Sequence, residues 1–208
     1  IIYIVLYIKN RSVVYLITDK LTYLFSFITY HDNSAEIIYL LFNNETTGFS
    51  MFPSVMYIHG LSSSGASSTA VNLRKLLPQY DVLSSDLPIQ PQEALTMLKE
   101  LCELYNPELI IGTSMGGMFA QQLRGYKKIL VNPAFHVSEF MRTHLGVHDF
   151  LNSRKNGETK YEITSELCDN YQLIEANQFA NITDFDIKNT YALFGAQDTL
   201  VHGYDEYI

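Results

Sequence analysis

The sequence is poor in cysteine and in basic residues. Its 2 cysteines, Cys102 and Cys168, are too few for a disulfide scaffold or an all-cysteine zinc site. Lys and Arg number 14 against 22 Asp and Glu, which gives a net charge of −8. Nucleic acids and anionic membranes attract a positive field, so this balance argues against both as main partners. The low cysteine content favours a protein of the reducing cytoplasm.

The sequence also lacks a long apolar run and a high density of charge. No run reaches the roughly 18 residues that a membrane helix needs. Apolar residues make up 47% of the chain and charged residues 17%, which argues against disorder and against a coiled coil. A length of 208 residues fits one domain or at most two small ones, with a proper hydrophobic core.

The first fifty residues differ from the rest. They hold one glycine and one alanine, and the runs 1–8, 21–30 and 37–42 have the composition of strands. Lys9 and Arg11 follow the first apolar run, which is the wrong order for a signal peptide. Three interpretations stay open: extra N-terminal strands, a membrane or targeting segment, and a non-native leader upstream of a start at Met51. The sequence favours the third, since AT-rich codons give this composition.

From Met51 onward, strand-like and helix-like segments alternate. Such alternation predicts an α/β fold, with a mostly parallel sheet and helices on both faces. We expect one domain over 51–208, with 134–187 as a cap or peripheral region. The chain stops at Ile208 inside an apparent helix start, so we expect the domain to be incomplete at its C-terminus. The predicted strands are 54–58, 80–85, 109–112, 128–132 and 190–194, and the predicted helices are 67–77, 91–105 and 115–123.

A glycine-flanked serine follows the third of these strands. Gly112-Thr113-Ser114-Met115-Gly116 fits the G-x-S-x-G pattern of a nucleophile elbow, in which a sharp strand-to-helix turn lifts the serine hydroxyl above the sheet. The strand before and the helix after are as the motif requires, so Ser114 is the predicted nucleophile. The alternative is an ordinary glycine-rich turn.

Backbone N–H groups near this serine are candidates for stabilising an oxyanion. Met115 N–H lies at the start of the helix, and Leu61 N–H follows His59-Gly60 at the end of the first strand of the block. His59 is expected to be structural rather than catalytic. Asp86, after the second strand, is expected to be a loop or cap residue, or otherwise part of a pocket rim.

An acid and a base complete the expected site. Asp198 follows the last predicted strand, in the place of the acid in the order Ser, acid, His. His136, His144 and His148 precede Asp198 and break that order, so we assign them to the cap or a solvated face. His202 is four residues after Asp198, too close for the usual spacing, and is a weak substitute. We expect the catalytic histidine to lie beyond residue 208.

Five short motifs follow one another along the chain: Met56-Tyr57-Ile58-His59-Gly60-Leu61-Ser62-Ser63-Ser64-Gly65, Ser85-Asp86-Leu87-Pro88, Ile111-Gly112-Thr113-Ser114-Met115-Gly116-Gly117, Val131-Asn132-Pro133-Ala134 and Gly195-Ala196-Gln197-Asp198-Thr199-Leu200-Val201. Together they resemble the YqiA/YcfP-type esterases, small α/β-hydrolases of bacteria. The motifs occur in that family's order and spacing.

The resemblance implies a three-layer α/β-hydrolase-like fold and a serine esterase without a cofactor, with Ser114 as nucleophile and Asp198 as acid; we also expect no metal site. It also implies a histidine in a short C-terminal Gly/His loop, which this sequence does not contain. The expected function is hydrolysis of small or acyl esters through an acyl-enzyme, with activity lowered in a chain without that histidine. Two alternatives stay open: an acyl-CoA thioesterase, for which Lys127 and Lys128 would be the basic patch, and a catalytically incomplete binding protein.

Overall fold

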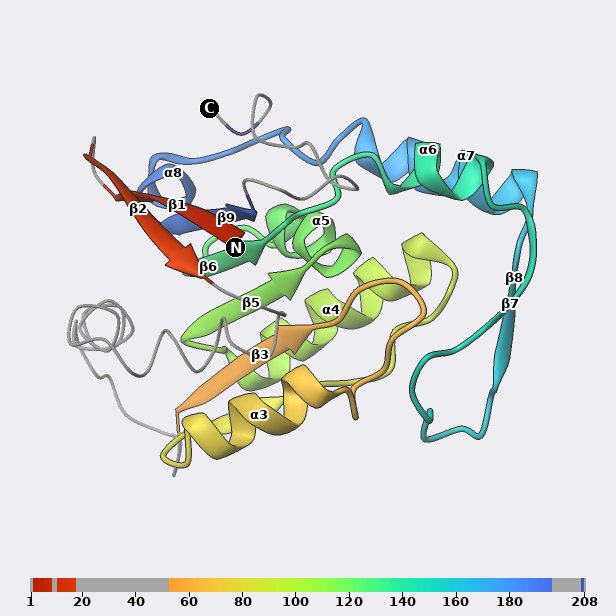
Figure 1. Cartoon of the computed structure of the whole chain (residues 1–208), viewed down its shortest axis with the longest axis horizontal. Coiled ribbons are helices and arrows are strands. Elements are labelled where there is room, and N and C mark those ends of the chain that lie inside the picture. The colour runs from red at the N-terminus through yellow and green to blue at the C-terminus, as the bar shows by residue number, and fades with distance from the viewer. Residues whose placement is uncertain (1, 9–10, 18–52, 196–206, 208) are drawn as a thin grey trace.

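The computed structural model describes residues 2–8, 11–17, 53–195 and 207 (Figure 1). In these ranges the strands are β1 (Ile2–Ile8), β2 (Arg11–Ile17), β3 (Ser54–Ile58), β4 (Asp81–Leu83), β5 (Leu109–Thr113), β6 (Lys128–Val131), β7 (Gly146–Asp149), β8 (Lys160–Ile163) and β9 (Thr190–Gly195). The helices are α3 (Ser68–Leu76), α4 (Pro91–Tyr105), α5 (Met115–Gln122), α6 (Val137–Arg142), α7 (Ser165–Glu175) and α8 (Asp184–Asn189). The predicted strands and helices from residue 54 onward are therefore confirmed, with bounds that differ by no more than two residues.

Seven strands form the main sheet, in the order β2-β1-β9-β6-β5-β3-β4. β4, β3, β5, β6 and β9 run parallel to one another. The chain passes from β3 to β4 on one side and then returns to β5 on the other side of β3. A ligand crevice in such a sheet lies where the strand order reverses, outside the carboxyl ends of the strands. Here that point lies between β3 and β5.

Alternate residues of the parallel strands face two separate hydrophobic layers. Met56, Ile58 and Ile110 pack with α4 and α5 in one cluster. Val55 and Tyr57 pack with α3 in the other. Successive strand residues point to opposite faces, so a sheet covered on both sides needs apolar residues at every position. The predicted α/β class, with helices on both faces, is confirmed.

Local sequence sets the helix ends. The Ser67 hydroxyl accepts the Ala70 N–H at 3.3 Å and so caps the start of α3. Pro91 occupies the first turn of α4, where its missing N–H costs nothing. Asn106, with a φ of 41°, ends α4 in the left-handed conformation that a C-cap requires.

The N-terminal residues add two antiparallel strands to the sheet. β1 pairs with β2 and, through residues 4–6, with β9. The run 1–8 was a predicted strand, whereas β2 was not among the predicted runs. The runs 21–30 and 37–42 lie outside the described residues, and whether 1–50 is native stays a prediction.

A buried ion pair fastens the start of β6 to α8. Lys128 is 0% exposed and Asp186 2%, and Lys128 Nζ lies 3.0 Å from Asp186 Oδ1. Lys128 Nζ also donates to the Leu123 carbonyl at 2.8 Å, and Asp186 accepts the Gly125 N–H at 3.0 Å. These groups lie at the amino end of β6, the opposite end from the crevice, so we assign them to stability.

The segment between β6 and β9 contains the predicted cap region. It holds α6, the antiparallel pair β7–β8, α7 and α8, and Figure 1 shows β7 and β8 standing away from the main sheet. Tyr161 and Tyr171 of this segment join the core cluster on the α4–α5 face. The segment therefore packs on the domain, and its role as a cap stays a prediction.

Candidate active site

Ser114 occupies the single residue between β5 and α5. Its φ of 52° and ψ of −122° are the mirror image of extended backbone, a region open to glycine and strained for serine. Four hydrogen bonds hold this backbone. Ser114 N–H donates to the Val131 carbonyl at 2.9 Å, and Ser114 O accepts the N–H groups of Gly117 at 2.8 Å, Ala134 at 3.0 Å and Met118 at 3.4 Å. These neighbouring residues therefore hold the Ser114 backbone in its strained conformation.

The two glycines of the motif allow the close approach of three elements. A Cβ at Gly112 would lie 2.3 Å from the Gly116 carbonyl oxygen. A Cβ at Gly116 would lie 2.1 Å from the Ile58 carbonyl oxygen. Side chains at these positions would push α5 off β5 and β3. The spacing of the glycines around the serine is therefore a packing requirement of this turn.

The Ser114 hydroxyl is half-buried and makes no hydrogen bond to the described part of the chain. The loop after β3 passes directly beside it: a Cβ at Gly60 would lie 3.3 Å from Ser114 Cβ and 3.7 Å from Ser114 Oγ. The N–H groups of Leu61 and Met115 have no backbone or side-chain acceptor within residues 53–195. The structure thus brings Ser114 next to Gly60, in a place with two unused donors nearby.

His59 holds this loop through both ring nitrogens. Its Nε2 accepts the Leu87 N–H at 3.1 Å, so its Nδ1 carries the proton and donates to the Gly60 carbonyl at 2.8 Å. The side chain is 2% exposed. With both nitrogens engaged, His59 has none left to take a proton from Ser114.

Acid should weaken the fold through His59. Burial lowers the His59 pKa below its ordinary 6.5, although the hydrogen bond to Gly60 opposes the shift. Below pH 6.5, His59 therefore binds a proton more readily in the unfolded chain than in the folded chain. The unfolding free energy consequently falls as the pH drops below 6.5. We expect the Tm of the wild type to fall more steeply than that of His59→Gln between about pH 7 and about pH 5. Equal slopes in thermal melts followed by circular dichroism would contradict this expectation.

The remaining predicted site residues fall in two groups. His144 and His148 lie between α6 and β8, where His144 Nδ1 contacts the Phe140 carbonyl at 2.8 Å and His148 Nε2 contacts the His144 carbonyl at 2.7 Å. His136 is the N-cap residue of α6. Asp198 and His202 lie outside the described residues.

The end of β9, which leads to Asp198, is fastened to β6. Asn132 follows β6 with a φ of 43°, and its Oδ1 accepts the Gly195 N–H at 2.7 Å. Asn132 N–H also donates to the Leu193 carbonyl at 2.8 Å. Gly195, the last residue of β9, thus lies at the carboxyl edge of the sheet, and only β6 separates β9 from β5 and Ser114.

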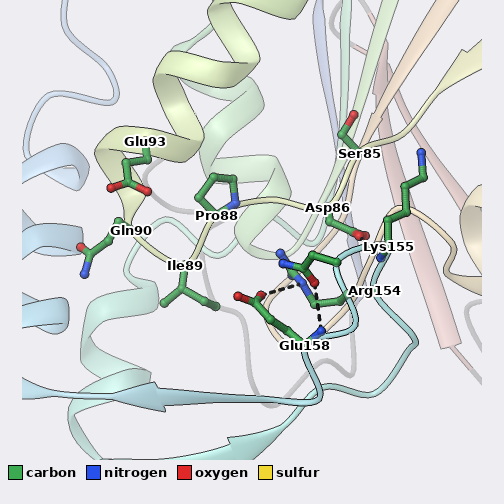
Figure 2. Close-up of a pocket in the computed structure, with 10 residues that line it drawn as sticks. Ser85, Asp86, Pro88, Ile89, Gln90, Glu93, Arg154, Lys155 and Glu158 are labelled. Carbon is green, nitrogen blue, oxygen red and sulfur yellow. Dashed lines mark hydrogen bonds and ion pairs between the residues drawn. The ribbon is translucent and has the colours of Figure 1, made fainter.

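A pocket of about 530 Å³ lies beside the β4–α4 loop. Figure 2 shows its lining, with Asp86 from that loop and Arg154 and Glu158 from the segment between β7 and β8. Arg154 Nε lies 3.5 Å from Glu158 Oε2, and its guanidinium sits 4.4 Å from the centre of the Phe150 ring. Ser114 does not line this pocket, so we treat the pocket as separate from the site around Ser114. Asp86 does line the pocket, in agreement with the sequence alternative that placed Asp86 on a pocket rim.

The described residues offer neither a metal centre nor a membrane helix. No group of three or more His, Cys, Asp or Glu there could hold a metal ion. No helix in the same ranges is long and apolar enough to cross a membrane. Both cysteines are buried free thiols.

A model of the uncharacterised protein family UPF0227 matches residues 54–185. The chain belongs to this family. UPF0227 is the family of the YqiA/YcfP esterases, so the resemblance drawn from the motifs is confirmed. The match contains Ser114, His59 and Asp86 and ends before Asp198. Membership in UPF0227 supports a hydrolase of the esterase type.

Two solved structures are similar at low identity. NosK from Streptomyces actuosus is 22% identical over 44% of this chain and 50% of that chain, with a TM-score of 0.38. A monoacylglycerol lipase from Paleococcus ferrophilus is 16% identical over 62% of this chain and 72% of that chain, with a TM-score of 0.40. The chain spans half the length of NosK, and similarity at this level says nothing about substrate. No curated protein matches the chain.

Proposed function

We propose that this UPF0227 member is a serine esterase with Ser114 as its nucleophile. The observation that carries the proposal is the strained backbone of Ser114 at the switch point of the sheet. Strain of this kind costs about 1–3 kcal/mol and persists at functional sites because the surroundings enforce it. It presents a partly exposed hydroxyl at the start of a helix.

In the proposed reaction, Ser114 Oγ attacks the ester carbonyl carbon while a histidine accepts the hydroxyl proton. The carbonyl oxygen becomes an oxyanion, and the N–H groups of Leu61 and Met115 donate to it. The alcohol leaves with the proton from the histidine. Water then adds to the acyl-enzyme with the same histidine as base, which releases the acid and restores Ser114.

We assign Asp198 as the residue that orients this histidine. Its support is its place in the sequence, three residues after the end of β9, and β9 ends at the carboxyl edge that also carries Ser114. His59 is unsuited to the role of base because both its ring nitrogens are bonded. Substrates in this scheme are small or acyl esters, and no cofactor takes part.

The burial of Lys128 argues against the thioesterase alternative. An acyl-CoA site would favour exposed cations for the CoA phosphates, and the sequence offered Lys127 and Lys128. Lys128 is fully buried and paired with Asp186, so it cannot contribute to a phosphate-binding patch. A carboxylic ester is the substrate class that remains best supported.

Covalent labelling tests the nucleophile directly. In a protein that includes the catalytic histidine, here called the wild type, we expect a fluorophosphonate probe to form an adduct on Ser114, located by peptide mass spectrometry. Ser114→Ala should lose the adduct, and Ser165→Ala, which alters an exposed serine at the start of α7, should keep it. An adduct on another residue, or a folded wild type that does not react, would contradict the proposal.

A further inference from the structure

The connection between β7 and β8 returns to the loop that follows β3. We call residues 150–159 the tongue and residues 60–65 the β3 loop. Leu151 N–H of the tongue donates to the Ser62 carbonyl at 2.7 Å, and the Ser63 hydroxyl donates to Asn152 Oδ1 at 3.1 Å. The tongue therefore contacts the two residues directly after Leu61.

Asp86 connects the same two segments with one carboxylate. Its Oδ1 accepts the Gly65 N–H at 2.8 Å, and its Oδ2 accepts the Lys155 N–H at 2.7 Å. Desolvation raises the pKa of this carboxyl, but the two backbone hydrogen bonds and Arg154 outweigh it, so the pKa is lowered and the group stays ionised at neutral pH. Both bonds are consequently charge-assisted, which makes them stronger than neutral ones.

A second set of contacts closes the arrangement through Leu87. Arg154 of the tongue is 9% exposed and donates to the Leu87 carbonyl at 2.8 Å. The N–H of Leu87 is the donor to His59 Nε2. The β3 loop is therefore fastened at its start by His59 and at its end by Asp86, and the tongue is fastened to both Asp86 and Leu87.

The contacts fix the direction of one peptide group. Gly60 O accepts from His59 Nδ1–H at 2.8 Å and from Ser63 N–H at 3.3 Å. In a trans peptide the C=O and the next N–H point in opposite directions, so holding Gly60 O also aims Leu61 N–H. An oxyanion donor stabilises the transition state only if it is oriented beforehand.

We propose that Asp86 is a positioning residue, which acts through the tongue to hold the β3 loop so that Leu61 N–H faces the oxyanion formed at Ser114. This inference rests on the proposed esterase function. It gives the β7–β8 connection a task in the reaction although none of its side chains needs to touch substrate.

A substitution at Lys155 separates this role from general stability. Residues 154–157 form a turn closed by Gly157 N–H and the Arg154 carbonyl at 3.1 Å, with Lys155 at its second position. Proline is favoured at that position, so Lys155→Pro removes the N–H that Asp86 accepts and keeps the turn. Lys155→Ala removes the side chain, keeps the N–H and is the matched control.

Hydrogen exchange and Ser114 labelling are the two measurements. Loss of a charge-assisted bond should raise the rate of amide hydrogen exchange in the β3 loop by about tenfold or more in Lys155→Pro and in Asp86→Ala. The exchange rate of β5 should stay unchanged. Fluorophosphonate labelling of Ser114 should slow by about tenfold in both variants. Lys155→Ala should match the wild type, and the double variant Asp86→Ala/Lys155→Pro should match Asp86→Ala.

The outcomes separate the two proposals. If wild type is labelled and Lys155→Pro behaves like Lys155→Ala, the positioning role is wrong and the esterase proposal stands. Faster exchange with unchanged labelling also overturns the positioning role. A wild type that is not labelled contradicts the esterase function and the positioning role with it. Asp86→Asn, which keeps one acceptor oxygen, should give an intermediate effect on both readouts, and it decides the matter if Lys155→Pro unfolds.

Discussion

Ser114→Ala should lower kcat for p-nitrophenyl ester hydrolysis by about 10⁴-fold or more, with little change in KM. The substitution removes the attacking oxygen and leaves the donors and the binding surface in place. Alanine has the same backbone restriction as serine at a φ of 52°, so the fold should be unaffected. Steady-state kinetics on purified protein that includes the catalytic histidine measures this.

Two variants control the kinetic result. Ser114→Gly should be as inactive as Ser114→Ala, but its unfolding free energy should be higher by about 1–3 kcal/mol because glycine relieves the strain. Ser165→Ala should keep wild-type kcat. A loss of less than about tenfold in Ser114→Ala would remove Ser114 from the reaction, and equal stabilities of the alanine and glycine variants would argue against the strain.

Asp186→Ala should lower the unfolding free energy by about 3–5 kcal/mol, because it leaves the Lys128 ammonium buried without its partner. The same loss corresponds to roughly 6–20 °C in Tm for a domain of this size. Urea unfolding followed by circular dichroism measures it. The double variant Lys128→Met/Asp186→Leu should recover most of the loss, since it removes both charges.

An exposed pair provides the control for Asp186. Lys160 and Asp149 lie 3.5 Å apart with 63% and 77% of their side chains exposed, so Asp149→Ala should change stability by less than about 0.5 kcal/mol. Hydrogen bonds from Thr183, Gly125 and Lys128 outweigh desolvation and lower the Asp186 pKa from 3.8 to about 2. The difference between wild type and Asp186→Ala should therefore shrink as the pH falls from 3.8 toward 2. A constant difference over this range would contradict the assignment.

The elements around Ser114 could be predicted because their signals are local. The apolar strand 109–113 and the glycines at 112 and 116 lie within a few residues of Ser114, and the helix after it has its own periodicity. The bounds of β3 and α4 followed in the same way from apolar runs and Pro91. Strand and helix signals depend on neighbours in sequence, so they survive without knowledge of the fold.

The arrangement around Leu61 could not be predicted from the same signals. Asp86 and Lys155 are 69 residues apart, and Ser63 and Asn152 are 89 apart. Nothing in the composition of the tongue marks it as a partner of the β3 loop. β2 is a different case: it contains the apolar run Val13-Val14-Tyr15-Leu16-Ile17, a local signal that the predicted strands left out, and the structure adds its pairing with β1.

By itself, the sequence determined the alternation of strands and helices, the strand-to-helix turn at Ser114 and the family, since each depends on residue types at short, fixed spacing. Only the tertiary structure decided that His59 uses both ring nitrogens, that Lys128 is buried against Asp186 and that Asp86 joins two loops. These contacts join segments brought together by the packing of the whole sheet. A carboxylate or an imidazole has the same formula in a loop, a core or a site, and its surroundings in space determine what it does.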